Sequence, residues 1–455
     1  MGRSVQWRIF ANTLTVAGFT ALVKVFGAAK MVVAARYFGT SGTLDAFLIA
    51  FLIPSFVAEV AAGSLAPSLI PTLVEMRERR GDDAARQLCG SVMAGSAVLL
   101  TALAVLLALG SPWILPLFGA GFDPAKREMT RWFFLMLLPW LPVSALIVTW
   151  RGALNSSERF AVPAGASVMT PLATIVLLWI AAPSWRTEAL VAGVLVGVCA
   201  EAAILAWAVG VHGFPLLPRW SGWTPELRLV GAQYLPMVAG AVILTGSPLV
   251  DQAMAGTLGP GSVSALTYGT KLASVLIGIA ALGLSTAVLP HLSRMLAGGD
   301  SAAVRRTVRT WTALALAAAI PLACVLAWWS EPLVRLLYQR GAFTAEATHG
   351  VAVIQRFSMA QLAPAVLLAL GLRLATAMRA NAMLMRVAFA GLLANIVLDV
   401  VLMRYLGAPG IALAAAGVSV LSLGYLAWLL RGGYPRISRS STRGSENVPA
   451  PPATS

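Results

Sequence analysis

Long apolar stretches separated by short polar ones dominate the pattern of hydrophobic and polar positions along this chain. A run of about 20 apolar residues is long enough to cross the hydrocarbon core of a bilayer as one α-helix. The pattern therefore predicts twelve membrane-spanning helices, near residues 12–37, 45–74, 88–110, 131–154, 160–182, 188–211, 229–258, 262–292, 308–329, 350–378, 380–404 and 410–430. The predicted fold class is an all-α polytopic membrane protein with about 12 transmembrane helices.

The composition and the placement of charge agree with this prediction. Hydrophobic residues make up 58% of the 455 and charged residues 11%, whereas a soluble domain carries about 25% charged residues. The net charge of +15 raises the question of nucleic acid, but most lysines and arginines fall in loops on one side of the predicted membrane. Because basic loops stay in the cytoplasm, we expect both termini to be cytoplasmic, anionic membrane lipids to be contacted, and no nucleic acid to be bound.

An internal repeat divides the chain into two similar parts. Four pairs of segments match at an offset of 219–222 residues, namely 35–39 with 255–259, 69–76 with 288–295, 111–122 with 330–343, and 150–151 with 372–373. Because each unit has six helices, an even number, the two copies share one orientation in the membrane. We predict an N-terminal six-helix lobe (1–211), a cytoplasmic linker (212–228), a C-terminal six-helix lobe (229–430) and a disordered basic cytoplasmic tail (431–455). Transporters built from such parallel repeats bind substrate in a central cavity between the halves.

Charged residues interrupt the predicted spans, although a charge at bilayer depth costs roughly 2.5–3.5 kcal/mol on insertion scales. They are Lys24, Lys30, Asp45, Asp251, Lys271, Arg373 and Asp399. Such residues usually face a partner or a water-filled cavity, so they indicate a polar pathway through the protein, and hence transport. We find no nucleotide-binding loop and no grouped histidines of the kind that enzymes use, and we expect a secondary transporter rather than an enzyme.

Several short motifs, in this order and at these spacings, resemble the MurJ/MviN family of lipid II flippases, within the multidrug/oligosaccharidyl-lipid/polysaccharide exporter superfamily. They occupy residues 24–30, 35–39, 45–47, 152–155, 159–163, 249–251, 261–264, 289–293 and 340–344. The resemblance implies a flippase in the bacterial cytoplasmic membrane. Its substrate would be a polyprenyl-diphosphate-linked saccharide, and a polymerase or synthase of the same pathway would be a partner.

The resemblance also assigns a substrate-binding role to several of the interrupting charges. Lys24, Lys30 and Lys271 stand where the family has arginines that line the cavity, although lysines at helix ends can also extend to the membrane surface. Asp45 is either a switchable partner of these lysines or an N-terminal helix cap. Arg373 either meets the substrate from the second half or anchors the helix at the membrane interface.

A second group of residues is acidic and resembles the family's sodium site. Asn395 and Asp399 are four residues apart, on one face of a helix, and Asp251 lies in another span. Oxygen ligands suit a hard cation, so we expect a sodium ion and no other cofactor. The alternative is a buried polar pair that holds helices together. The family's threonine on the last helix is missing near residues 414–416, where Ser419 could replace it.

Departures from the family leave the substrate open. The basic pair of its second helix is replaced here by residues 56–59, which include Glu59. We therefore expect lipid II or a related envelope polysaccharide precursor, such as an exopolysaccharide or O-antigen repeat unit. A cation antiporter for drugs or metabolites on the same scaffold, and a non-transporting scaffold of an envelope assembly complex, are the alternative functions.

Overall fold

The computed structural model describes residues 2–185 and 187–432. Within these ranges the chain folds into α-helices with two short π-helical segments and no strand. The first half holds α1 (Gly2–Phe38), α2 (Gly42–Val57), η1 (Ala58–Ala62), α3 (Leu65–Arg80), α4 (Asp82–Phe118), α5 (Pro124–Leu137), α6 (Trp140–Ser156), α7 (Ala161–Ala166), α8 (Met169–Trp185) and α9 (Glu188–Val211). The second half holds α10 (Pro225–Thr245), α11 (Ser247–Ala255), α12 (Ser262–Gly283), η2 (Leu284–Val288), α13 (Leu289–Ala297), α14 (Ser301–Trp328), α15 (Ser330–Tyr338), α16 (Ala345–Met359), α17 (Leu362–Ala377), α18 (Asn381–Leu406) and α19 (Ala408–Gly432).

The helices reproduce the predicted membrane spans. Within the described residues, eleven helical segments are long and apolar enough to cross a membrane, and the pair α16–α17, bent by 42°, makes a twelfth. Both the all-helical class and the set of twelve spans are therefore confirmed. The agreement follows from physics, since a chain in hydrocarbon must satisfy its backbone hydrogen bonds within each segment.

Local sequence signals set where several of these helices begin. The side chains of Ser41, Asp123, Thr224 and Thr344 accept hydrogen bonds from backbone N–H groups in the first turns of α2, α5, α10 and α16, respectively. Each oxygen satisfies a donor that has no partner inside the helix, which is why these residue types are favoured at the position. Polar loop residues thus fix the ends of spans whose middles are almost wholly apolar.

The two halves share an unusual feature that supports the repeat. In the first half, α2 continues through the π-helical segment η1 into α3, and in the second half α12 continues through η2 into α13. A π-helical turn contains one extra residue and reorients the helix beyond it. The same irregularity at corresponding places fits a duplicated six-helix unit.

The segments outside the helices refine the predicted boundaries. The predicted linker, 212–228, is shorter here, because Thr224 caps α10 and Pro225 begins it. The linker lies along α4, where the Arg219 N–H donates to the Gly90 carbonyl over 3.2 Å. At the other end of the chain α19 extends to Gly432, and the rest of the predicted tail lies outside the described residues. The lobe boundaries stay a prediction.

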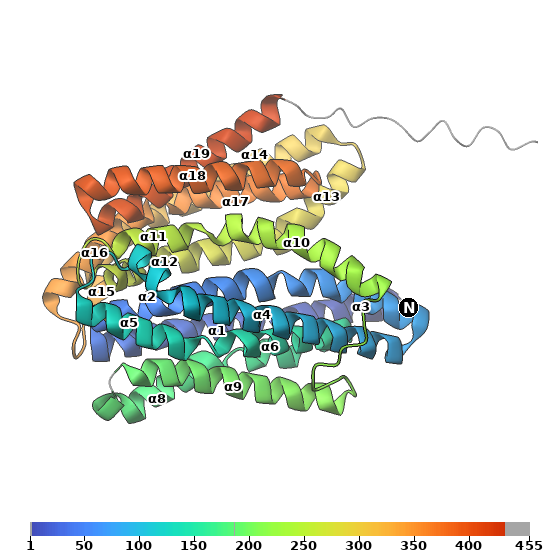
Figure 1. Ribbon diagram of the computed structural model, residues 1–455. Helices are drawn as coiled ribbons and strands as arrows, with labels where there is room; N and C mark the ends of the chain where they lie inside the picture. The colour runs from blue at the N-terminus through green and yellow to red at the C-terminus, as the bar shows by residue number, and fades with distance from the viewer. Residues whose placement is uncertain (1, 186, 433–455) are drawn as a thin grey trace, which may run out of the picture.

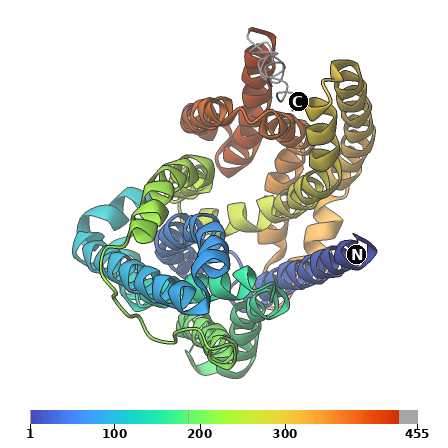
Figure 2. The ribbon, with the colours of Figure 1, turned by 90° about the vertical axis from the view of Figure 1, so that its right-hand side faces the viewer.

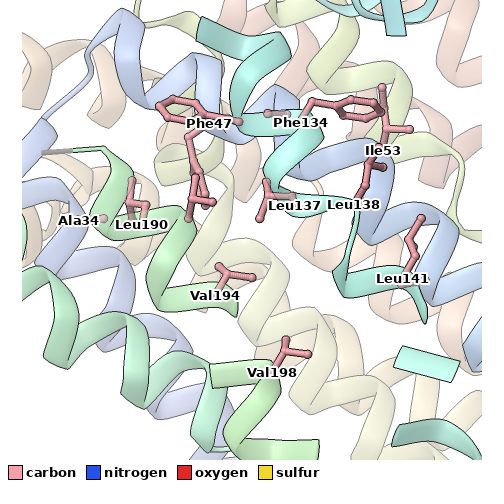
Figure 3. Close-up of a cluster of buried hydrophobic side chains, with 14 of the residues drawn as sticks. Ala34, Phe47, Ile53, Phe134, Leu137, Leu138, Leu141, Leu190, Val194 and Val198 are labelled. Atoms are coloured by element: carbon pink, nitrogen blue, oxygen red, sulfur yellow. The ribbon is translucent and has the colours of Figure 1, made fainter. Parts of the chain in front are cut away.

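The main apolar core lies in the first half and packs α2, α5, α6 and α9 together. Figure 3 shows Phe47 and Ile53 of α2 facing Phe134 and Leu137 of α5, with Leu190 of α9 beside them. The same cluster includes Tyr268, Tyr338 and Phe343 of the second half. The core therefore crosses from one half to the other at the end of the molecule where α2 begins.

The helices lie side by side along one direction, with α8 and α9 on one side of the molecule and α18 and α19 on the other (Figure 1). Figure 2, which looks along the helices, shows the second half of the chain beside the first. The halves meet where α2 contacts α11 and α12, and where α10 contacts α3 and η1. The central cavity described next lies at the first of these boundaries.

Candidate substrate cavity and cation site

A first cavity of about 260 Å³, here called the Lys30 cavity, lies where α1 and α2 meet α11 and α12. Its lining residues are Lys30, Met31, Ala34, Leu44, Phe47, Leu48, Phe51, Leu52, Ser55, Leu190, Gln252, Thr267 and Tyr268. The Lys30 ammonium lies 6.0 Å from the centroid of the Phe51 ring, within range of a cation–π interaction. The cavity thus combines an apolar wall with one positive charge.

A second cavity of about 380 Å³, here called the Lys271 cavity, lies among α11, α12, α18 and α19. Lys271, Asp251, Asn395 and Ser419 are among the residues that line it. Met31, Gln252 and Thr267 line both cavities, so the two adjoin. Together they form the central cavity, with walls from both halves of the chain.

Two of the three lysines predicted to bind substrate, Lys30 and Lys271, line this cavity, whereas Lys24 lines neither part of it. Lys30 and Lys271 lie close enough to repel each other electrostatically, as do Lys271 and Lys24. Lys24 is exposed, and its Nζ lies 3.7 Å from the point where a Cβ on Gly278 of α12 would be. Within the described residues none of the three forms a salt bridge. Ammonium groups that lie this close together without a carboxylate partner favour an anion beside them.

Asp45 lies elsewhere, in a contact between the two halves. It is fully buried, and its carboxylate accepts hydrogen bonds from the backbone N–H of Gly261 over 2.6 Å and of Ser264 over 2.8 Å. Lys126 of α5 reaches the same carboxylate over 3.5 Å. Asp45 therefore does cap a helix, but that helix is α12 of the second half, whereas Ser41 caps α2. In this structure its charged partner is Lys126, and neither Lys24 nor Lys30 pairs with it.

The acidic residues predicted to hold a cation come together. The Asn395 Nδ2 group donates to Asp251 Oδ1 over 2.9 Å and to Asp399 Oδ2 over 3.1 Å. Oδ1 of Asn395 and Oδ1 of Asp399 are buried without a hydrogen-bond partner. A buried carboxylate, Asp399, and a half-buried one, Asp251, that share one neutral donor are costly, so a bound cation or a proton would stabilise them.

Ser419 shares the cavity with this group, as its place in the sequence suggested. It lies on α19, and its hydroxyl donates to the Ala415 carbonyl over 2.9 Å, which leaves lone pairs of the hydroxyl oxygen available. Within the described residues no three His, Cys, Asp or Glu side chains form a metal site. An oxygen set of this kind suits a weakly bound alkali cation better than a transition metal.

Arg373 and its counterpart in the repeat, Arg151, have different surroundings. Arg373 lies on α17 with its Nε buried and without a partner, and it lines neither part of the central cavity. Arg151 forms a salt bridge with Glu201 and donates to Ser167 Oγ over 2.7 Å. A substrate-binding role for Arg373 stays a prediction, while Arg151 joins helices within the first half.

Sequence reasoning missed two polar residues of the Lys30 cavity, Gln252 and Tyr268. The Gln252 Oε1 atom and the Tyr268 hydroxyl are buried without a hydrogen-bond partner. Neither residue stands out in the sequence, because an uncharged glutamine or tyrosine in a membrane helix costs much less free energy than a charged residue. Gln252 had one available signal, since it directly follows Asp251.

The fold defines a two-lobed, all-helical membrane transporter. It superposes on a structure described as "Lipid II flippase MurJ, inward closed conformation" with a TM-score of 0.80 and 22% identity, covering 92% of this chain and 87% of that one. An inward-facing multidrug resistance MATE family transporter of the MOP superfamily gives a TM-score of 0.74 at 14% identity, covering 90% of this chain and 94% of that one. At these identities the likeness establishes the fold.

The sequence narrows the class to one family. The profile described as "Lipid II flippase MurJ" matches residues 34–438, so the chain belongs to this family. The lipid II flippase MurJ of Burkholderia cenocepacia is 28% identical over 386 residues, covering 78% of this chain and 72% of that protein. A probable lipid II flippase MurJ of Rhizobium meliloti is 29% identical over 343 residues, covering 73% of this chain and 64% of that protein.

Proposed function

We propose that this protein is a flippase for a polyprenyl-diphosphate-linked saccharide, lipid II or a related envelope polysaccharide precursor. It would move the lipid from the inner to the outer leaflet of the bacterial cytoplasmic membrane. The observation that carries the proposal is a cavity between the two halves that is lined by two unpaired lysines, Lys30 and Lys271, with a third, Lys24, close to Lys271. A diphosphate supplies the negative charge that this cavity lacks.

The proposed cycle is alternating access between the halves. With both termini in the cytoplasm, the loop between α1 and α2 lies outside, and the Asp45 contact with α12 closes the cavity on that side. The headgroup would enter from the cytoplasmic side and draw the lysines together. Opening of the outer contact would then release the lipid to the outer leaflet, where a polymerase or synthase of the same pathway would use it.

A cation would drive the return of the empty carrier. We propose sodium at Asp251, Asn395 and Asp399, because these residues leave two acceptor oxygens buried and unpartnered beside the cavity. Binding at this site would pull α11 and α18 together, since Asp251 lies on the former and the other two lie on the latter. The coupling ion would thus bind beside the same cavity that Lys271 lines.

The transport proposal is tested with purified protein in liposomes that carry fluorescent lipid II in the inner leaflet. We expect flipping by the wild type and at least a tenfold loss in Lys24→Ala and Lys271→Ala, because each removes one of three charges around the diphosphate. Arg79→Ala, which removes a basic residue from an exposed surface pair away from the cavity, serves as a comparison. Equal flipping by wild type and both alanine variants would overturn the proposal.

The sodium proposal has a readout that needs no lipid. Because a ligand that binds the folded state stabilises it, sodium chloride should raise the unfolding temperature of the wild type above its value in choline chloride. Asp251→Asn should abolish this difference, while Asp83→Asn, at an exposed carboxylate, should preserve it. A sodium response of the same size in Asp251→Asn would remove the site from the account.

A related saccharide lipid, rather than lipid II itself, is the second candidate. Glu59 is exposed within η1, on the same helical face as Ser55 and Leu52 of the Lys30 cavity. A carboxylate at this position would place a negative charge near the part of the headgroup that extends past the diphosphate. Flipping of an exopolysaccharide repeat unit in preference to lipid II would favour this candidate.

A further inference from the structure

Two residues that line the Lys30 cavity carry polar groups that form no hydrogen bond within the described protein. The Tyr268 hydroxyl and Gln252 Oε1 are buried without a partner, and the tyrosine as a whole is only 3% exposed. Leaving a buried polar atom unpaired costs about 1–3 kcal/mol. Both residues line the same cavity of about 260 Å³, so a ligand bound there would lie beside both unpaired groups.

The walls of this cavity differ from side to side. From α2 come the carbon surfaces of Leu44, Phe47, Leu48, Phe51 and Leu52, together with Ser55, whose hydroxyl already donates to the Leu52 carbonyl over 2.8 Å. By contrast, α1, α11 and α12 contribute the polar groups of Lys30, Gln252, Thr267 and Tyr268. A ligand that fits must be apolar on one face and hydroxylated on its edge. A sugar ring has this character, because its C–H bonds form the faces and its hydroxyls form the rim.

Hydrogen-bond chemistry separates a sugar from the diphosphate here. Gln252 Oε1 can only accept a hydrogen bond, and an ionised phosphate has no hydrogen to donate. A sugar hydroxyl can donate to Gln252 and at the same time accept from Tyr268 or Lys30. The Lys30 cavity thus suits a saccharide, while the Lys271 side of the central cavity, with Lys24 nearby, suits the diphosphate.

We propose that the Lys30 cavity is the saccharide subsite, in which Gln252 and Tyr268 bind the hydroxyls of the sugar attached to the diphosphate. This inference rests on the proposed function and adds which part of the headgroup each region binds. It places the sugar at the closed end of the cavity, under the contact between Asp45 and α12. Gln252 and Tyr268 then determine selectivity between glycosylated and bare carriers.

The test compares two ligands on the purified full chain in lipid nanodiscs. One is undecaprenyl diphosphate and the other is lipid II, which carries the same lipid and diphosphate plus a disaccharide. The wild type should bind lipid II more tightly. Tyr268→Phe and Gln252→Leu should each lower the affinity for lipid II about fivefold to tenfold, as expected for one lost hydrogen bond, and change the affinity for undecaprenyl diphosphate less than twofold.

Two further variants serve as controls. Tyr338→Phe alters a tyrosine whose ring lies 5.0 Å from that of Tyr268 but that does not line the cavity, and it should change neither affinity. Lys271→Ala should weaken both ligands alike. The unfolding temperature of Tyr268→Phe should be no lower than that of the wild type, because the hydroxyl has no partner to lose and its removal relieves an unpaired buried group.

The possible results separate the inference from the proposed function. An undiminished preference for lipid II in both cavity variants would overturn the saccharide subsite and leave the flippase proposal standing. Equal binding of the two ligands by the wild type would also overturn the subsite. Binding of neither ligand by the wild type would instead refute the proposed function, and the subsite with it.

Discussion

At the scale of single residues, the most constrained charge in the protein is the carboxylate of Asp45. It compensates two N–H groups in the first turn of α12 and pairs with Lys126, whose ammonium lies 3.8 Å from the centroid of the Phe122 ring. Both charged side chains are almost entirely buried. Asp45 therefore joins the two halves through its hydrogen bonds to Gly261 and Ser264, while Lys126, from the same half as Asp45, balances its charge.

Asp45→Ala should destabilise the protein strongly, because it strands a buried ammonium and two backbone donors. Loss of one partner of a buried pair costs about 3–5 kcal/mol, and a lowered unfolding temperature in detergent would report it. Asp82→Ala removes an exposed partner of Arg77 and should cost less than about 1 kcal/mol. Similar unfolding temperatures for the two variants would contradict the role assigned to Asp45.

Some site residues could be predicted from sequence and others could not. The lysines and the Asp251, Asn395 and Asp399 group could be singled out from sequence because charge is costly in a membrane. The structure brings the three polar residues together and places Lys30 and Lys271 on the cavity wall, while the roles of all these residues stay a prediction. The partners of Asp45 were not found, because the bond to Ser264 joins positions that only the packing of the two halves brings together. Gln252 and Tyr268 were not predicted, because what distinguishes them is a buried polar atom without a hydrogen-bond partner, and no sequence pattern shows that.

At the scale of elements, the turn between α15 and α16 fastens the second half to the end of α1. The Ala342 N–H donates to the Arg36 carbonyl over 2.8 Å. The preceding Gly341 has φ +61°, and a Cβ there would lie 2.3 Å from the same carbonyl oxygen. Only glycine permits this close approach in a left-handed conformation.

Gly341→Ala should therefore separate the turn from α1 and lower the unfolding temperature. Gly299→Ala is a matched control, because Gly299 has φ +74° but nothing within 4 Å of its would-be Cβ. The control incurs only the backbone strain of about 1–2 kcal/mol, while Gly341→Ala adds an overlap that costs about 1–3 kcal/mol more. Equal losses in the two variants would show that the close approach is unimportant.

Element positions were largely predictable, whereas their irregularities were not. Hydropathy alone located the twelve spans, since the membrane requires long apolar helices. The π-helical segments η1 and η2 were not predicted, because residues such as Ala58 and Leu284 are compatible with an ordinary α-helix. The start of α10 was placed slightly late, although Thr224 followed by Pro225 is a strong helix-start signal.

At the scale of the whole molecule, the two halves meet around a cavity that holds positive charge on one part of its wall and a cation-suited group on another. The end of the cavity near the loop between α1 and α2 is closed by the Asp45 contact and by the aromatic packing of Tyr268, Tyr338 and Phe343. An anionic headgroup and a driving cation would therefore act on the same boundary. This arrangement is what a coupled flippase requires.

The measurement that tests this account most directly is genetic complementation. A bacterium depleted of its own lipid II flippase would express this protein, with Lys24→Ala and Lys271→Ala variants produced to equal levels in the membrane. The account predicts growth with the wild type and none with either variant. Equal growth with the wild type and both lysine variants would contradict lipid II flipping through this cavity. Failure of the well-expressed wild type to support growth would contradict it as well.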